Sequence, residues 1–196
     1  REMTDRFRFE ATATGQTVVF QAVSDLILDS AIVSLITALV GTALFLVVIY
    51  WFLESLPTIG LANLAPILVT VSLIAATMRV LGIAFNAFTA TILALTIGLG
   101  IDYSVHVVHR FIDEYAERDL YPALRRTVVG TGGALTGSML TTVFGVGVLA
   151  LALNPAVGVF GVLIAMSVLY AYLTSIVVLP SILVLWARFV DGASTH

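Results

Sequence analysis

Long uncharged stretches dominate the sequence and predict helices that cross a membrane. Five segments are apolar and long enough, at a rise of ~1.5 Å per residue, to span a hydrocarbon core ~30 Å thick. They are residues 31–53, 56–78, 86–108, 128–152 and 158–187. Four of these segments contain no Asp, Glu, Lys or Arg, and the remaining one contains a single acid. Between the last two, Asn154-Pro155 predicts a turn, and Pro180 predicts a kink in the final span.

The residues before the first span have a different character. Arg6 to Ala11 alternates polar and apolar side chains, which is the period of a half-buried strand. Residues 1–16 are therefore interpreted as the tail of a water-exposed domain, and residues 17–29 as a short connecting helix.

Residues 110–126 combine four arginines and four acids with apolar residues at helical spacing. Within them, Glu114 and Arg118 are placed for an i,i+4 ion pair. We interpret this segment as an amphipathic helix on the membrane surface, with a solvated loop as the alternative. This segment and the tail after Ala187 hold five arginines, against one in the other turns, so they are expected to be cytoplasmic. Five spans then place the N-terminal end outside the cytoplasm.

Composition supports an all-α membrane protein and excludes several other classes. Of 196 residues, 60% are hydrophobic and 11% are charged, whereas about a quarter are charged in soluble domains. There is no cysteine and no basic footprint for nucleic acid. No metal-ligand spacing, phosphate-binding loop or activated nucleophile is present, so we expect no enzyme, no cofactor and no metal site.

Asp102 is the acid within the third span and the first candidate for function. It lies eight residues before Arg110, about 12 Å along the helix and close to the expected midplane. Charge at this depth costs several kcal/mol, so an intramembrane acid indicates a functional site by default. The alternative is a structural acid that is hydrogen-bonded to a neighbouring helix.

Four neighbours of Asp102 in sequence are expected to shape this site. His106 lies at i+4 on the same helix face, and Tyr103 is adjacent. Gly98 and Gly100 would let another helix approach closely and enclose the carboxyl, although ordinary helix packing would also explain them.

The fourth span adds hydroxyl groups to this picture. Ser138, Thr141 and Thr142 are spaced i, i+3 and i+4 and so fall on one side of the helix. We expect Ser138 or Thr141 to face the acid-bearing span and orient its carboxyl or a water. Generic packing of small residues is the alternative.

The chain resembles the resistance–nodulation–division (RND) superfamily, specifically its MMPL-like branch of lipid and hydrophobe exporters. The resembling segments are Phe85-Asn86-Ala87-Phe88-Thr89-Ala90-Thr91, Gly98-Leu99-Gly100-Ile101-Asp102-Tyr103, His109-Arg110-Phe111 and Thr141-Thr142-Val143-Phe144-Gly145. The resemblance implies that Asp102 and Tyr103 form the proton-relay pair of the family. It also implies that residues 1–16 end an extracytoplasmic porter-like domain, and that the five spans form a half-bundle of the RND and sterol-sensing type.

The resemblance further implies proton-motive-force-driven export of lipid-like or hydrophobic solutes by a larger transporter. Its partners would be membrane lipids, the hydrophobic substrate, and a second RND repeat from the same chain or another copy. Tripartite drug-efflux relatives add a lysine and an arginine within neighbouring spans, and this chain has neither. Two alternatives stay open: a sterol-sensing-domain-like lipid sensor that does not transport, and a translocation motor like SecD/SecF. In the motor an acid precedes the arginine, where this chain has His109.

Overall fold

The computed structural model describes residues 16–193, in which every regular element is helical. The elements are α1 (Gln16–Glu54), α2 (Pro57–Ala62), α3 (Leu64–Leu81), α4 (Ala87–Glu117), α5 (Leu120–Gly147), the 3-10 turn η1 (Val148–Leu151), α6 (Pro155–Leu173), the π-helical turn η2 (Thr174–Val178) and α7 (Leu179–Ala193). They form five helical segments long and apolar enough to cross a membrane, which confirms the predicted all-α membrane fold. The strand predicted at Arg6 to Ala11 lies outside the described residues.

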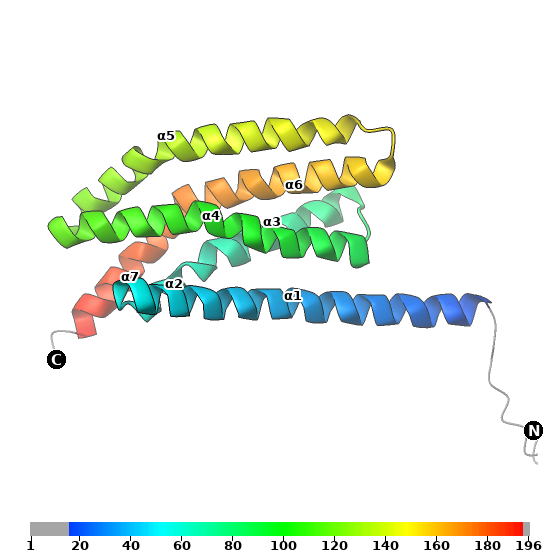
Figure 1. Ribbon diagram of the computed structural model, residues 1–196, viewed down its shortest axis with the longest axis horizontal. Coiled ribbons are helices and arrows are strands. Elements are labelled where there is room, and N and C mark those ends of the chain that lie inside the picture. The colour runs from blue at the N-terminus through cyan, green and yellow to red at the C-terminus, as the bar shows by residue number, and fades with distance from the viewer. Residues whose placement is uncertain (1–15, 194–196) are drawn as a thin grey trace, which may run out of the picture.

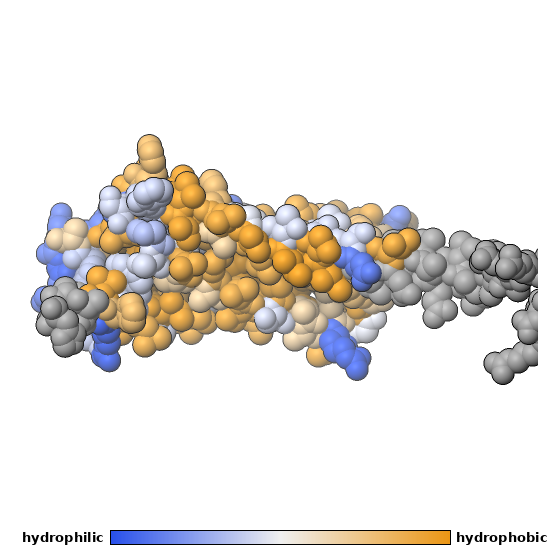
Figure 2. All heavy atoms as spheres, turned by 90° about the horizontal axis from the view of Figure 1, so that it is seen from below, coloured by the Kyte–Doolittle hydropathy of each residue, from blue (hydrophilic) through white to orange (hydrophobic). Residues whose placement is uncertain are grey.

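The long helices run nearly parallel to the long axis of the molecule (Figure 1). Helix α6 packs against α3, α4 and α5, while α1 packs along α4 at one side. Side chains of α1 are largely exposed, among them Val33, Leu44 and Phe52. Figure 2 shows hydrophobic residues covering the middle of one face and hydrophilic residues gathered toward its ends. This distribution is that of a bundle whose outer surface contacts lipid.

Two predicted segments are continuous with the neighbouring spans. The predicted connecting helix 17–29 and the span 31–53 belong to one helix, α1. The segment 110–126 comprises the end of α4, a break at Arg118 and Asp119, and the start of α5. Neither residues 29–31 nor residues 108–111 contain Gly or Pro, so α1 and α4 each continue through the junction between apolar and polar residues.

The charged end of α4 is held by an ion cluster. Glu114 is 5% exposed and accepts hydrogen bonds from Arg118 and from Arg110, whose Nη2 lies 2.6 Å from Oε1. The predicted Glu114–Arg118 pair is therefore confirmed, and Arg110 extends it by one helical turn. Two arginines compensate the cost of burying this carboxylate.

Proline residues account for the two irregular spans. Pro66 cannot donate a backbone hydrogen bond to the Ala62 carbonyl, and the helix breaks at Asn63 between α2 and α3. Pro180 cannot donate to Ile176, and the disturbance expected there takes the form of the π-helical turn η2.

Hydroxyl pairs link α6 and η2 to three other helices. The pairs are Thr70–Thr174 at 2.8 Å, Thr77–Tyr170 at 3.0 Å, Thr96–Ser167 at 2.7 Å and Thr136–Tyr172 at 2.7 Å between oxygens. Interhelical hydrogen bonds of this kind direct packing in membranes, where apolar contact with lipid competes with apolar contact between helices. These pairs fix α6 relative to α3, α4 and α5.

Helix α2 approaches the backbone of α1 at Gly60. A Cβ atom at Gly60 would lie 2.8 Å from the Leu46 carbonyl oxygen, closer than real Cβ contacts allow. Gly41 in α1 has open space around the same position.

We therefore expect Gly60→Ala to destabilise the protein by about 1–3 kcal/mol, the usual cost of overpacking. Gly41→Ala is the matched control and should be neutral or stabilising by up to ~1 kcal/mol, because Ala favours helix over Gly. Thermal unfolding of the full-length protein in detergent measures both. Equal melting temperatures for the two variants would contradict the close approach.

Candidate functional site

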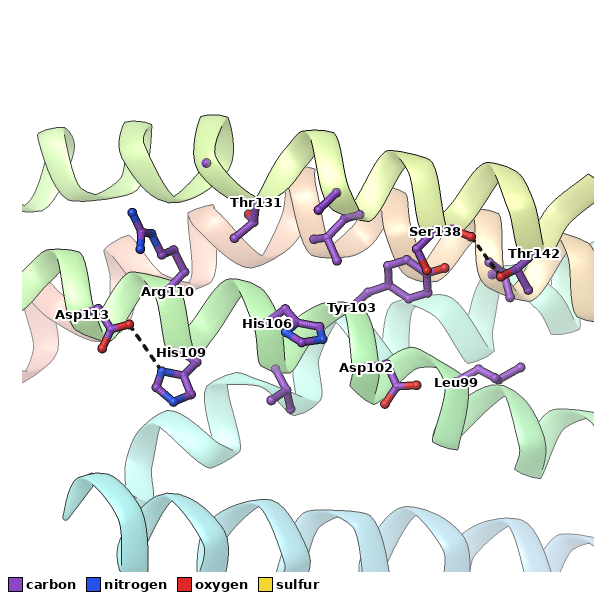
Figure 3. Close-up of a pocket in the computed structure, with 15 residues that line it drawn as sticks. Leu99, Asp102, Tyr103, His106, His109, Arg110, Asp113, Thr131, Ser138 and Thr142 are labelled. Carbon is purple, nitrogen blue, oxygen red and sulfur yellow. Dashed lines mark hydrogen bonds and ion pairs between the residues drawn. The ribbon is translucent and has the colours of Figure 1, made fainter.

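A groove of about 920 Å³ lies between α4 and α5 and holds most of the predicted site residues. Its polar lining includes Asp102, Tyr103, His106, Ser138 and Thr142 (Figure 3). Leu99, Val105, Ala134, Leu135 and Val168 supply apolar walls. The groove thus combines a few polar groups with an apolar surface, which is typical of sites for hydrophobic ligands.

Asp102 lies near the middle of α4 and is exposed to the groove. Within residues 16–193 it has no hydrogen-bond or ion-pair partner. In Figure 3 its carboxylate points away from α5. Asp102 is thus exposed rather than enclosed, and the close helix approach expected around its carboxyl is not seen within residues 16–193.

The two glycines before Asp102 have different surroundings. Gly100 is buried, and a Cβ there would lie 3.8 Å from a side-chain carbon of Ile67 on α3. Gly98 is exposed, with nothing within 4 Å of the same position. Only Gly100 thus packs against another helix of this chain in the described structure.

His106 shares the groove-lining face of α4 with Asp102, as their spacing predicts. One turn further, His109 Nδ1 lies 3.7 Å from Asp113, and both residues line the end of the groove with Arg110. Within residues 16–193, no three His, Cys, Asp or Glu side chains are grouped closely enough to bind a metal.

Tyr103 is 6% exposed and connects the groove to the core. Its ring meets that of Tyr172 on α6 edge-on, with centroids 6.4 Å apart. The Tyr172 hydroxyl in turn pairs with Thr136 on α5. Tyr172 was not identified from the sequence, because its contacts are with residues of two other helices and no local motif marks it.

The structure separates the two predicted hydroxyl residues of α5. Ser138 lines the groove, whereas Thr141 is exposed outside it and donates to the carbonyls of Gly137 and Ser138. Thr142 lines the groove instead, because it lies one turn from Ser138 on the same helix face. Sequence spacing alone cannot distinguish neighbours that differ by about 100° in direction.

Comparison with known proteins identifies a matching family and two relatives. The model of the MMPL family matches residues 5–195. A protein of Methanocaldococcus jannaschii, described as a membrane protein, is 28% identical over 182 residues, 92% of this chain and 46% of the relative. The apo-petrobactin exporter of Bacillus anthracis is 28% identical over 156 residues, 76% of this chain and 21% of the relative. The chain thus spans less than half the length of either relative, and no solved structure matches it significantly.

The Tyr172–Thr136 bond can be measured with a double-mutant cycle of Tyr172→Phe and Thr136→Val. We expect a coupling free energy of about 0.6 kcal/mol and at most ~1.7 kcal/mol, the range for hydrogen bonds between membrane helices. The measurement is chemical or thermal unfolding of the four proteins in detergent.

Thr141→Val replaces Thr136→Val in the control cycle, because the Thr141 hydroxyl bonds only its own helix. Its effect and that of Tyr172→Phe should add within about 0.5 kcal/mol. Additive effects in the first cycle as well would show that the hydroxyl pair does not couple α5 to α6.

Proposed function

Because the chain belongs to the MMPL family, we propose that it forms half of the membrane domain of a proton-driven exporter for lipid-like or hydrophobic solutes. Asp102 is the observation that carries this proposal. It is the sole acidic residue between Glu54 and Arg110, and it lies mid-helix on a groove with no partner among the described residues. A charged side chain in that position is energetically costly, so an acid there indicates a functional site.

In the proposed cycle, Asp102 takes up a proton from the extracytoplasmic side and releases it to the cytoplasm. The membrane potential supplies ~2.3 kcal/mol per charge per 100 mV for such a movement. The neutral acid is tolerated in an apolar groove, whereas the carboxylate favours a polar partner or water. Tyr103, His106 and Ser138 line the same groove and are the proposed relay partners.

The arginine distribution supports an orientation for this cycle. Arg118, Arg125, Arg126 and Arg188 lie at the end of the bundle with the α4–α5 connection, and Arg79 lies toward the other end. The excess of arginine near span ends favours the cytoplasm. We therefore propose a cytoplasmic C-terminus and an extracytoplasmic N-terminal end.

A second repeat is the proposed partner of the uncovered face of α4. Exposed residues recur along this helix at Leu95, Gly98, Asp102 and His109. These intervals of three, four and seven residues form the seam along which one helix packs against another. A pseudo-symmetric repeat, from the rest of a longer chain or from another copy, would cover Asp102 and complete the site.

Two other functions would use the same groove differently. A lipid sensor would bind a hydrophobic ligand there without consuming a proton gradient. The SecD/SecF alternative has no specific support, since the arginine at the end of the groove follows His109 rather than an acid. The gradient dependence of transport separates the exporter from the sensor.

We expect Asp102→Asn to abolish gradient-driven export by the full-length protein while leaving the fold intact. Asn has nearly the same shape as Asp but cannot carry the charge. The measurement is export of a hydrophobic fluorescent substrate from proteoliposomes under an imposed proton gradient. Asp119→Asn is the matched control, because Asp119 is exposed at the N-cap of α5 and Asn caps helices equally well.

Export that persists in Asp102→Asn and still depends on the gradient would refute the proposed coupling. If an uncoupler leaves the wild-type response to ligand unchanged, the exporter is excluded in favour of the sensor. A folded Asp102→Asn protein with unchanged melting temperature shows that loss of export is not loss of structure.

The pH dependence of the transport rate tests which hydroxyl residues take part in the proposed relay. Ser138→Ala and Tyr103→Phe should each slow export about 2- to 10-fold, the effect of losing one neutral hydrogen bond. Thr141→Val should leave the rate and its pH profile unchanged, because Thr141 lies outside the groove lining. Unchanged profiles in Ser138→Ala and Tyr103→Phe would remove both from the relay.

A further inference from the structure

Three arginines from two helices surround a second, smaller cavity at the charged end of the bundle. Arg110 of α4 and Arg125 and Arg126 of α5 line a cavity of about 300 Å³ together with Val129 and Gly130. The three positive charges converge from both sides of the α4–α5 interface.

The cavity keeps an excess of positive charge. Arg110 is paired with Glu114, which also binds Arg118. Arg125 and Arg126 are exposed and have no acidic or hydrogen-bond partner within residues 16–193. Two guanidinium groups are therefore free to bind an anion, and their planar donors match the oxygens of a phosphate.

An apolar surface leads from this cavity along the outside of α5. Val129 is 74% exposed, Leu140 is 43% exposed and Phe144 is 70% exposed. These residues and Gly133 lie on the same side of the helix as Arg126, at intervals of three, four or seven residues. A Cβ at Gly133 would meet nothing within 4 Å, so the surface is shallow there.

The depth of the arginines fits the headgroup region. Arg126 directly precedes the uncharged stretch that begins at Thr127. An anion held by Arg125 and Arg126 would thus lie at the membrane boundary, with the apolar stripe extending into the hydrocarbon. Basic pockets between helices at this level bind anionic lipid headgroups.

We propose that this cavity binds the phosphate of an anionic phospholipid, whose acyl chain lies along Val129, Gly133, Leu140 and Phe144. The cavity adjoins the Asp102 groove, with which it shares Arg110 and Gly130, but it does not include Asp102 and does not depend on the proposed transport. Its ligand is a structural lipid of the surrounding membrane rather than the exported solute. Arg110 lines the cavity from α4, so the bound lipid would bridge α4 and α5, the two helices on either side of the Asp102 groove.

Lipid binding is measured on the full-length protein by native mass spectrometry after delipidation. The probes are phosphatidylglycerol, phosphatidylcholine and inorganic phosphate, each added to the wild type and to Arg125→Gln/Arg126→Gln. At about 1 kcal/mol per arginine near the surface, the double variant should bind phosphatidylglycerol about 5- to 30-fold more weakly. Arg79→Gln is the matched control, because Arg79 is also exposed but lies at the end of α3, away from the cavity. It should change the affinity less than about twofold.

The wild type gives a test that needs no variant. It should bind phosphatidylglycerol more tightly than phosphatidylcholine, and the difference should shrink as ionic strength rises. Inorganic phosphate should not displace the bound lipid, because it cannot use the apolar stripe.

Equal affinity for the two lipids, or unchanged phosphatidylglycerol binding in the double variant, would overturn the site. Displacement by inorganic phosphate would overturn the lipid assignment and show a site for the free anion.

Discussion

The absence of water from a bilayer core requires polar groups within it to find partners in the protein, and this requirement organises the bundle. The interhelical hydroxyl pairs described for α6 satisfy it and fix that helix against its neighbours. In the pair of Thr96 and Ser167, for example, one hydroxyl donates to the other, and the accepting hydroxyl donates to a backbone carbonyl of its own helix, so neither is left unsatisfied. Hydrogen bonding therefore fixes how far α6 can slide along its neighbours, which apolar contacts alone would not fix.

Two acids on α4 show how differently the same requirement can be met. Glu114 is buried and neutralised by two arginines, so its charge is part of the structure. Asp102 lies about three turns earlier and has no described partner. An acid without a fixed partner can change its charge without breaking an ion pair, which is what separates a candidate coupling group from a structural one.

Helix boundaries that depend on local sequence signals could be predicted. Features that depend on contacts between helices were harder to predict. Asn86 caps α4 in a capping box with Thr89, and Asn154 caps α6, so these boundaries follow from sequence. The helical character of segment 110–126 followed from its pattern, but the break at Arg118 and Asp119 did not, because no Gly or Pro marks it. The groove position of Asp102 and His106 followed from i,i+4 spacing. The position of Tyr172 did not follow from sequence spacing, since its contacts form only when α4, α5 and α6 assemble.

Among the described residues, three have buried side-chain polar atoms without a hydrogen-bond partner, and two of the three lie at helix irregularities. The third is Tyr50 in α1. Asn63, at the break between α2 and α3, is fully buried with neither amide atom hydrogen-bonded in the structure. Ser175, within the π-helical turn η2, has a buried hydroxyl that is likewise unpaired. Because regular backbone hydrogen bonds are already interrupted there, bending the spans at these points disrupts fewer bonds than bending them elsewhere. Tyr172 lies two residues before η2, and its ring contacts that of Tyr103, the sequence neighbour of Asp102. The irregular turn in this span therefore lies next to the residues that connect the groove to the core.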